Sequence, residues 1–172
     1  VVYDSGSRDR THEIARELGA RVVVDTDWQG FGRQRQRAQA AAHGAWILML
    51  DADERITPEL ARSIQAAVAR DERSAVYEVS RLAWCFGRFI RHSGWYPDRV
   101  LRLYAAERAR FDAALVHEKL DVGPGLRVER LEGDLLHFTY KDLRHYLVKS
   151  ADYAAAWSEQ RAREGRHSSL LE

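Results

Sequence analysis

Short apolar runs alternate with helical patterns through the first third of the chain. Three runs are long enough for a strand and too short for a membrane span: residues 1–3, 22–24 and 46–50. Between them, residues 12–18 and 33–42 carry the spacing and end signals of helices. Three alternations of strand and helix predict a parallel sheet with right-handed crossovers.

The pattern changes after residue 56. Thr57 and Pro58 predict a helix start, as N-cap and first helical residue. From residue 75, short alternating stretches predict mixed or antiparallel strands that finish the sheet, with a last short strand at 134–140. A long helix is predicted from Lys141, with an apolar stripe that we expect to pack on the core: Leu143, Tyr146, Leu147, Ala151, Ala154 and Trp157.

These elements predict an α/β fold with two parts. Residues 1–140 form the main domain, and residues 141–172 form a helical extension that packs on it. A doubly wound sheet normally has a strand and a helix before a unit of this kind. We therefore expect the domain to be truncated at its amino-terminal end.

Composition excludes some function classes. The chain has 172 residues, 45% hydrophobic and 31% charged, which is ordinary for a globular domain, and its net charge of +1 predicts no bulk attraction to nucleic acid. The single cysteine, Cys85, forms no internal disulfide and fits a reducing compartment. With no signal peptide or membrane-spanning run in the sequence, we expect a cytoplasmic location.

Arginine is concentrated in one part of the chain. Between Arg81 and Arg110 the arginines outnumber the acids, Asp98 and Glu107, so this part predicts a local positive field. Such a field favours an anionic acceptor and peripheral contact with the inner face of a membrane. The alternative is that these side chains only keep the surface soluble.

Acidic side chains follow two of the predicted strands. Asp4 ends the first run, and Asp51, Asp53 and Glu54 end the third. Ligands of open α/β sheets bind at the carboxyl ends of strands, so these acids are candidates for holding a hard cation or a ribose and diphosphate. Ordinary solvated acids at a strand end are the alternative. A histidine such as His137, at a later strand, would suit a metal that needs a further protein ligand.

The ordered set of motifs resembles family 2 glycosyltransferases, and among them the lipopolysaccharide core glucosyltransferase branch. The resemblance runs through nearly the whole chain. It is carried by Asp4-Ser-Gly-Ser-Arg-Asp9, Trp28-Gln-Gly-Phe-Gly32, Asp51-Ala-Asp53, Ser93-Gly-Trp-Tyr-Pro-Asp98, Leu101-Arg-Leu103, Val116-His-Glu118 and Leu136-His137.

The resemblance implies a GT-A (Rossmann-like) fold and inverting transfer of a hexose from a nucleotide sugar, with UDP-glucose as the expected donor. The implied acceptor is an anionic glycolipid of the lipopolysaccharide inner core. Glu118 is the implied catalytic base, and Asp53 and His137 the implied ligands of Mg²⁺ or Mn²⁺. The expected donor-binding residues are Asp4, Ser5, Arg35, Asp51 and Asp53. The expected acceptor-binding residues are Trp95, Tyr96, Arg99, Arg102 and His117.

Two other interpretations stay open. An apolar strand followed by Asp-x-Asp also resembles the nucleophile motif of haloacid-dehalogenase-like phosphatases, but Arg55 stands where Thr or Val is expected. The acidic pair expected after Gly133-Asp134 is also missing. The second alternative is a non-catalytic domain of the same fold that binds a sugar nucleotide.

Overall fold

The computed structural model describes residues 1–165 and has the mixed α/β architecture expected from the sequence. The chain divides into two compact units. Unit 1 contains Val1–Gly44, Arg110–Asp121 and the chain from Tyr153 on, whereas unit 2 contains Ala45–Ala109 and Val122–Asp152.

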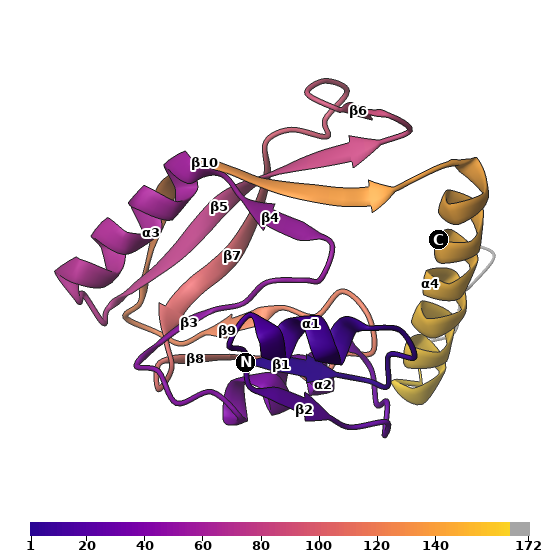
Figure 1. The fold of residues 1–172 in the computed structure, drawn as a ribbon, viewed down its shortest axis with the longest axis horizontal. Coiled ribbons are helices and arrows are strands. Elements are labelled where there is room, and N and C mark those ends of the chain that lie inside the picture. Colours follow the sequence, from indigo (N-terminus) through magenta and orange to yellow (C-terminus); the bar gives the residue numbers. More distant parts are fainter. Residues whose placement is uncertain (166–172) are drawn as a thin grey trace. The chain divides into compact units, whose positions relative to one another are not determined.

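Unit 1 contains the first strand-helix repeats. Strands β1 (Val2–Asp4) and β2 (Val22–Val24) pair in parallel, with Tyr3 opposite Val23. Helix α1 (Thr11–Glu17) connects them, and α2 (Phe31–Ala40) follows β2 (Figure 1). A small two-stranded sheet is formed by β8 (Ala109–Phe111) and β9 (Leu120–Val122), and the connection between these strands carries Glu118.

Unit 2 is built on a sheet of six strands in the order β3-β7-β5-β10-β4, with β6 paired to β5. Its long strands β5, β7 and β10 are seen in Figure 1 as the magenta to orange arrows. The strands are β3 (Trp46–Leu48), β4 (Glu54–Ile56), β5 (Ala75–Cys85), β6 (Arg88–Phe89), β7 (Asp98–Ala105) and β10 (Arg127–Tyr140).

Strand directions correct one prediction. Parallel pairing is found for β1 with β2 and for β5 with β10, but β3 pairs antiparallel with β7, where Ile47 lies opposite Tyr104. The expectation of a parallel partner for the third strand was therefore wrong. Alternation of strands and helices fixes a direction only when successive strands are neighbours, and here a later strand is the neighbour of β3. The antiparallel strands expected from residue 75 are confirmed by the pairing of β5 with β7.

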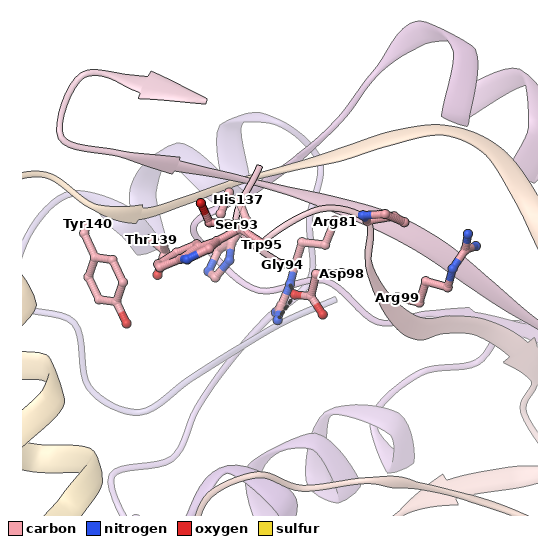
Figure 2. A pocket seen from close by; sticks show the side chains of 11 residues that line it. Arg81, Ser93, Gly94, Trp95, Asp98, Arg99, His137, Thr139 and Tyr140 are labelled. Atoms are coloured by element: carbon pink, nitrogen blue, oxygen red, sulfur yellow. Dashed lines mark hydrogen bonds and ion pairs between the residues drawn. The ribbon is translucent and has the colours of Figure 1, made fainter. Parts of the chain in front are cut away.

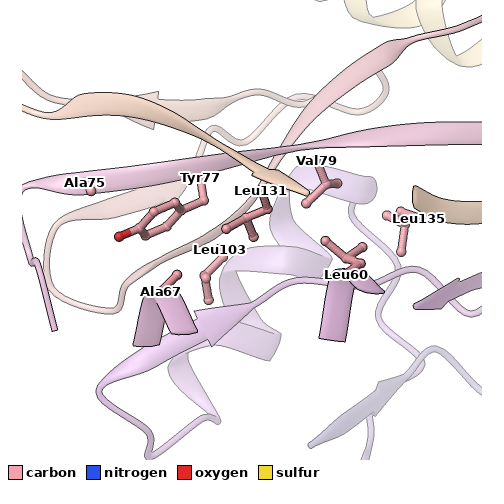
Figure 3. Packing of buried hydrophobic residues seen from close by; sticks show 8 residues of the cluster. All are labelled: Leu60, Ala67, Ala75, Tyr77, Val79, Leu103, Leu131 and Leu135. Carbon is pink, nitrogen blue, oxygen red and sulfur yellow. The ribbon is translucent and has the colours of Figure 1, made fainter. Parts of the chain in front are cut away.

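The core of unit 2 lies between its sheet and helix α3 (Pro58–Arg70). Thr57 caps the helix, since its hydroxyl accepts a hydrogen bond from the Leu60 amide at 3.3 Å, as the sequence predicted. Figure 3 shows Leu60 and Ala67 of α3 facing the sheet residues Tyr77 and Leu103. Every residue of this cluster is at most 3% exposed, so the sheet is rigidly anchored on this face.

Helix α4 (Leu143–Arg163) differs from the prediction. All six residues of the predicted core stripe are exposed, with Leu143 63% and Leu147 57% exposed. The half-buried positions are instead mostly polar, among them His145, Lys149 and Gln160. The periodicity was detected correctly, but its assignment to the core was wrong because spacing does not say which face is covered. The division into 1–140 and 141–172 stays a prediction, and residues 166–172 of that extension lie outside the described residues.

Within residues 1–165, every helix lacks the combination of length and apolar character that a membrane span requires.

Candidate functional site

In unit 1, Asp4 organises the loop that follows β1. Its Oδ1 accepts hydrogen bonds from the Gly6 and Ser7 amides at 2.8 and 2.7 Å and from His12 Nε2 at 2.8 Å, while Oδ2 accepts from the Ser7 hydroxyl at 2.6 Å. Burial raises the pKa of Asp4, but the bonds from Ser7 and His12 outweigh it and hold the pKa well below its ordinary value. Asp4 is therefore a carboxylate whose bonds fix the loop, and Ser5 is exposed within that loop.

Unit 1 also carries the predicted base. Glu118 lies in the connection between β8 and β9, where its Oε1 accepts a hydrogen bond from Arg35 Nε at 2.6 Å. Both side chains are nearly buried, with 13% and 11% of their surface exposed. The preceding residue, His117, has a φ of 57°, in the left-handed region that non-glycine residues seldom adopt. Strained positions of this kind are concentrated at functional sites.

The start of α2 holds the Glu118 connection in place. The Phe31 and Gly32 amides donate to the Leu115 and Ala114 carbonyls at 3.0 and 2.9 Å. A Cβ on Gly32 would lie 2.3 Å from the Asp112 carbonyl oxygen, so only glycine permits this approach. The Trp-Gln-Gly-Phe-Gly motif thus sets the position of the loop, and Arg35, one turn later, reaches Glu118.

In unit 2, the acidic stretch after β3 is tied to a buried arginine. Arg102 Nη2 donates to Glu54 Oε1 at 2.6 Å and to Asp51 Oδ2 at 2.9 Å. The Glu54 side chain is fully buried, and Arg102 as a residue is 4% exposed. The guanidinium of Arg102 is therefore enclosed and neutralises the two acids, and its expected role in binding an acceptor stays a prediction.

Asp53 lies apart from that pair and has two other basic partners. Its Oδ2 is 3.3 Å from His137 Nε2 and 3.5 Å from Lys149 Nζ, and its carbonyl accepts from the Phe138 amide at 2.8 Å. Burial raises the pKa of Asp53, but the hydrogen bond and charge of His137, together with Lys149, outweigh it and lower the pKa to about 2. Asp53 is therefore ionised at neutral pH and next to an imidazole.

A cavity of about 520 Å³ opens in unit 2 next to this group. His137 lines it, together with Trp95, Arg99, Asp98 and Thr139 (Figure 2). Arg81 Nη2 forms an ion pair with Asp98 at 2.6 Å on its wall. The cavity thus contains two of the expected acceptor residues and one expected metal ligand, and its walls present both charges and the ring of Trp95.

The remaining expected acceptor residues lie elsewhere. Tyr96 does not line the cavity, because its hydroxyl donates to Asp134 Oδ1 at 2.8 Å. His117 is exposed in unit 1, where its ring lies 6.1 Å from that of Tyr153. Tyr96 and His117 therefore have structural partners that the sequence did not predict.

Three residues at these sites were missed by the sequence reasoning: His12, Glu54 as an ion-pair partner, and Lys149. His12 lies in α1, eight residues after Asp4 at the end of β1, and this spacing does not by itself predict a contact. Lys149 is one of only three lysines in the chain, which is the one signal that was available.

The comparisons with known proteins agree with the motifs. A family model described as "Glycosyl transferase family 2" matches residues 1–132. An uncharacterized glycosyltransferase of Rickettsia conorii is 36% identical, over 96% of this chain and 62% of its own length. The lipopolysaccharide core biosynthesis glycosyltransferase LpsC of Rhizobium meliloti is 26% identical, over 96% of this chain and 63% of its own.

A shorter match has higher identity. A TPR repeat-containing protein of Synechococcus elongatus is 45% identical over 44% of this chain and 19% of its own length. The chain spans about three fifths of the length of the glycosyltransferases that it matches. Since the family model covers more than half of the chain, the chain belongs to glycosyl transferase family 2.

Proposed function

We propose that this chain carries the donor-side chemistry of an inverting glycosyltransferase that moves a hexose from a nucleotide sugar to an anionic glycolipid. The observation that carries the proposal is the pairing of Asp53 with His137 beside a cavity, in a chain of glycosyl transferase family 2. The expected donor is UDP-glucose. The name of the LpsC relative supports an acceptor from the lipopolysaccharide core.

The residues around Asp53 fit a divalent cation that binds together with the donor. A carboxylate and an imidazole 3.3 Å apart provide two ligands, and within residues 1–165 no group of three potential metal ligands occurs. Mg²⁺ and Mn²⁺ commonly use one or two protein ligands and complete their coordination with substrate phosphates and water. An ion held there would supply positive charge against the negative charge of a diphosphate leaving group. Asp53 and His137 are thus the proposed ligands.

Lys149 is a proposed third member of this group. Its ammonium lies 3.5 Å from Asp53 and supplies a positive charge at the same carboxylate. A lysine in this position competes with a cation for Asp53, and it is also able to contact a phosphate oxygen. Lys149 therefore sets how strongly the carboxylate attracts a metal.

Glu118 is the proposed general base. In an inverting transfer the acceptor hydroxyl loses a proton as it attacks, and a positioned carboxylate raises the rate of such a step by about 10²–10⁴-fold. Glu118 is nearly buried and is oriented by its bond with Arg35 at 2.6 Å. Arg35 is therefore assigned to positioning this carboxylate in addition to its expected donor role.

The acceptor side is proposed to involve the cavity of unit 2. Trp95 is 42% exposed at its edge and offers an apolar face of the kind that packs on sugar rings. Arg99 lines the same cavity and suits an anionic group of the acceptor. Arg102 is left out of this role because it is buried against Glu54.

Incubation of the chain with a panel of UDP-sugars, Mn²⁺ and a lipopolysaccharide core glycolipid as the acceptor, with UDP release as the readout, tests the proposal. We expect release from at least one UDP-hexose, and loss of metal-dependent nucleotide binding in Asp53→Ala. Hydrolysis of small phosphate esters without any action on UDP-sugars would point to the phosphatase interpretation. Binding of UDP-sugars without turnover would point to the non-catalytic one.

A further inference from the structure

The tip of the β5–β6 hairpin has an unusual residue. Cys85 and Arg88 are paired, so the loop consists of Phe86 and Gly87, with φ values of 52° and 92°. Positive φ at both positions is the pattern of type I′ turns, which favour Asn, Asp or Gly. Phe86 instead places a large apolar ring there and leaves it 53% exposed. Phe86 is therefore unfavourable for folding in two respects, its left-handed backbone and its exposed apolar ring. Left-handed non-glycine residues cost stability and are concentrated at functional positions.

This ring belongs to an ordered aromatic group. The Phe86 amide donates to the Tyr140 carbonyl at 3.1 Å, which ties the hairpin to the end of β10. The Phe86 ring lies 6.5 Å from Tyr140 and 6.3 Å from Tyr146, and the two tyrosine rings are 5.0 Å apart. The hairpin tip and the start of α4 thus present one continuous surface.

The first turns of α4 extend the surface with apolar side chains. Leu143, Tyr146 and Leu147 are exposed, whereas Lys149 and His145 occupy the half-buried side. The helix therefore directs its apolar side away from the sheet. The hairpin-helix surface consists of four apolar and three basic residues: Phe86, Leu143, Tyr146, Leu147, Arg88, Lys141 and Arg144.

Basic side chains surround this apolar group. Arg88, Lys141 and Arg144 are exposed, and none of them forms an ion pair within residues 1–165. Other basic residues of unit 2 differ in this respect, since Arg91, Arg99, Arg102 and Lys149 pair with acids. Asp142 is the acidic residue between Lys141 and Arg144. Its side chain accepts a hydrogen bond from the His145 amide and caps α4.

We propose that the hairpin-helix surface docks on the surface of a lipid bilayer with anionic head groups. Aromatic and leucine side chains enter the interfacial layer, and unpaired basic side chains meet lipid phosphates. The charge pattern disfavours a second copy of the chain, because association through this surface would gather like charges. The inference deepens the proposed function and rests on it, since a glycolipid acceptor is presented by a membrane.

Vesicle co-sedimentation of the full chain tests the proposal. Vesicles of phosphatidylcholine with phosphatidylglycerol are compared with vesicles of phosphatidylcholine alone, each at low and at high salt. We expect binding to the anionic vesicles only, weakened by salt. Each basic residue near a membrane contributes about 1 kcal/mol, so replacing Arg88, Lys141 and Arg144 by Gln should weaken binding by about 100-fold. The matched control replaces the exposed Arg62, Arg108 and Arg110 by Gln.

The apolar side is tested with Phe86→Asn. Asn suits a left-handed turn position, so this variant should be at least as stable as the original chain while binding vesicles more weakly. A loss of binding therefore has no explanation in misfolding. Leu147→Gln is a second variant, and Val128→Ser is the control, since Val128 is 55% exposed elsewhere in unit 2.

Equal and negligible binding to both kinds of vesicle would overturn the proposal, as would equal losses in the surface and control variants. Self-association measured by ultracentrifugation, and abolished by Phe86→Asn, would identify a second copy as the occupant instead. Release of UDP from a UDP-sugar, with a detergent-dispersed lipopolysaccharide core glycolipid as the acceptor, is measured in parallel without vesicles. Normal release without vesicle binding would reject the surface and leave the proposed function standing, whereas vesicle binding without release would do the reverse.

Discussion

The ammonium of Lys149 lies 3.5 Å from the carboxylate of Asp53, which is also the proposed metal ligand. A cation and this ammonium cannot both neutralise the carboxylate without mutual repulsion, so the two are thermodynamically linked. Lys149→Met removes the competing charge and keeps most of the side-chain length. We expect it to tighten binding of Mn²⁺ alone by at least about fivefold, the lower end of typical coupling between sites. Titration followed by the electron paramagnetic resonance of free Mn²⁺ measures this directly.

Lys141→Met is the matched control for that titration, since Lys141 is exposed and has no acid partner among residues 1–165. Equal Mn²⁺ affinity in both variants would remove Lys149 from the metal group. Weaker affinity in Lys149→Met would assign the lysine a supporting role in place of a competing one.

The buried pair of Arg102 and Glu54 gives a prediction about stability. Arg102→Met leaves a fully buried carboxylate whose remaining basic neighbour is Arg81 at 3.7 Å. Breaking a buried pair by removing one partner typically costs about 3–5 kcal/mol. Arg99→Met is the control, because Arg99 pairs with Glu78 at a partly exposed position and should cost less than about 1 kcal/mol. Urea unfolding measures both, and equal costs would contradict the role given to Arg102.

Gly32 gives a prediction about the loop that carries Glu118. In Gly32→Ala the new methyl group would lie 2.3 Å from the Asp112 carbonyl oxygen, so the helix start and the loop must separate. We expect a loss of stability of about 1–3 kcal/mol, the usual cost of overpacking. Gly123→Ala adds the same group where no atom lies within 4 Å, and it should change stability by at most about 0.5 kcal/mol. A cost in Gly32→Ala no larger than this would show that the approach is not tight.

The lowered pKa of Asp53 predicts a dependence of stability on pH. The pKa is 3.8 for the free group and about 2 in the folded chain, so the ionised carboxylate stabilises the fold above about pH 4. This contribution is lost as the pH falls from about 4 through the folded pKa of about 2. Asp53→Asn lacks it, so the difference in unfolding free energy between the two proteins should shrink over that window. Urea unfolding at several pH values measures the difference.

Asp121→Asn serves as the control for the pH series, because Asp121 is exposed and forms no ion pair within the described chain. A difference between Asp53→Asn and the original chain that stayed constant from pH 6 to the acid range would refute the assigned cause. The partly exposed position of Asp53 makes the size of the effect sensitive to salt, so one ionic strength is used throughout.

The sequence predicted most local structure because local signals determine it. Thr57 and Pro58 specify the start of α3 through capping chemistry, and the apolar run 46–50 specifies β3. The partner of β3 was not predictable in this way, since β7 lies about 50 residues later in the sequence. The outward direction of the α4 stripe was missed for a related reason. Spacing identifies a face, and only the folded chain determines what covers it.

The candidate site also combines residues that the sequence predicted with contacts that only the folded chain shows. Asp53 and His137 were named from motifs, and they lie 3.3 Å apart because β10 passes beside the acidic stretch. Lys149 joins them from α4, a contact that no motif encodes. Arg102 was expected to bind an acceptor because of its charge. Charge alone does not reveal burial, and Arg102 is buried in an ion pair with Glu54. The sequence thus gives the chemical types, and tertiary contacts decide their roles.

The central claim is that Glu118 accepts the proton of the attacking hydroxyl, and Glu118→Gln tests it most directly. Gln retains the size and the ability to accept the Arg35 hydrogen bond, but it cannot take up a proton. UDP release from UDP-glucose, with a lipopolysaccharide core glycolipid as the acceptor, is measured under single-turnover conditions, alongside donor affinity, with the exposed Asp121→Asn as the matched control. The account predicts a rate about 10²–10⁴-fold lower in Glu118→Gln with donor affinity unchanged, and near-normal turnover in Asp121→Asn. Near-normal turnover in Glu118→Gln would contradict it.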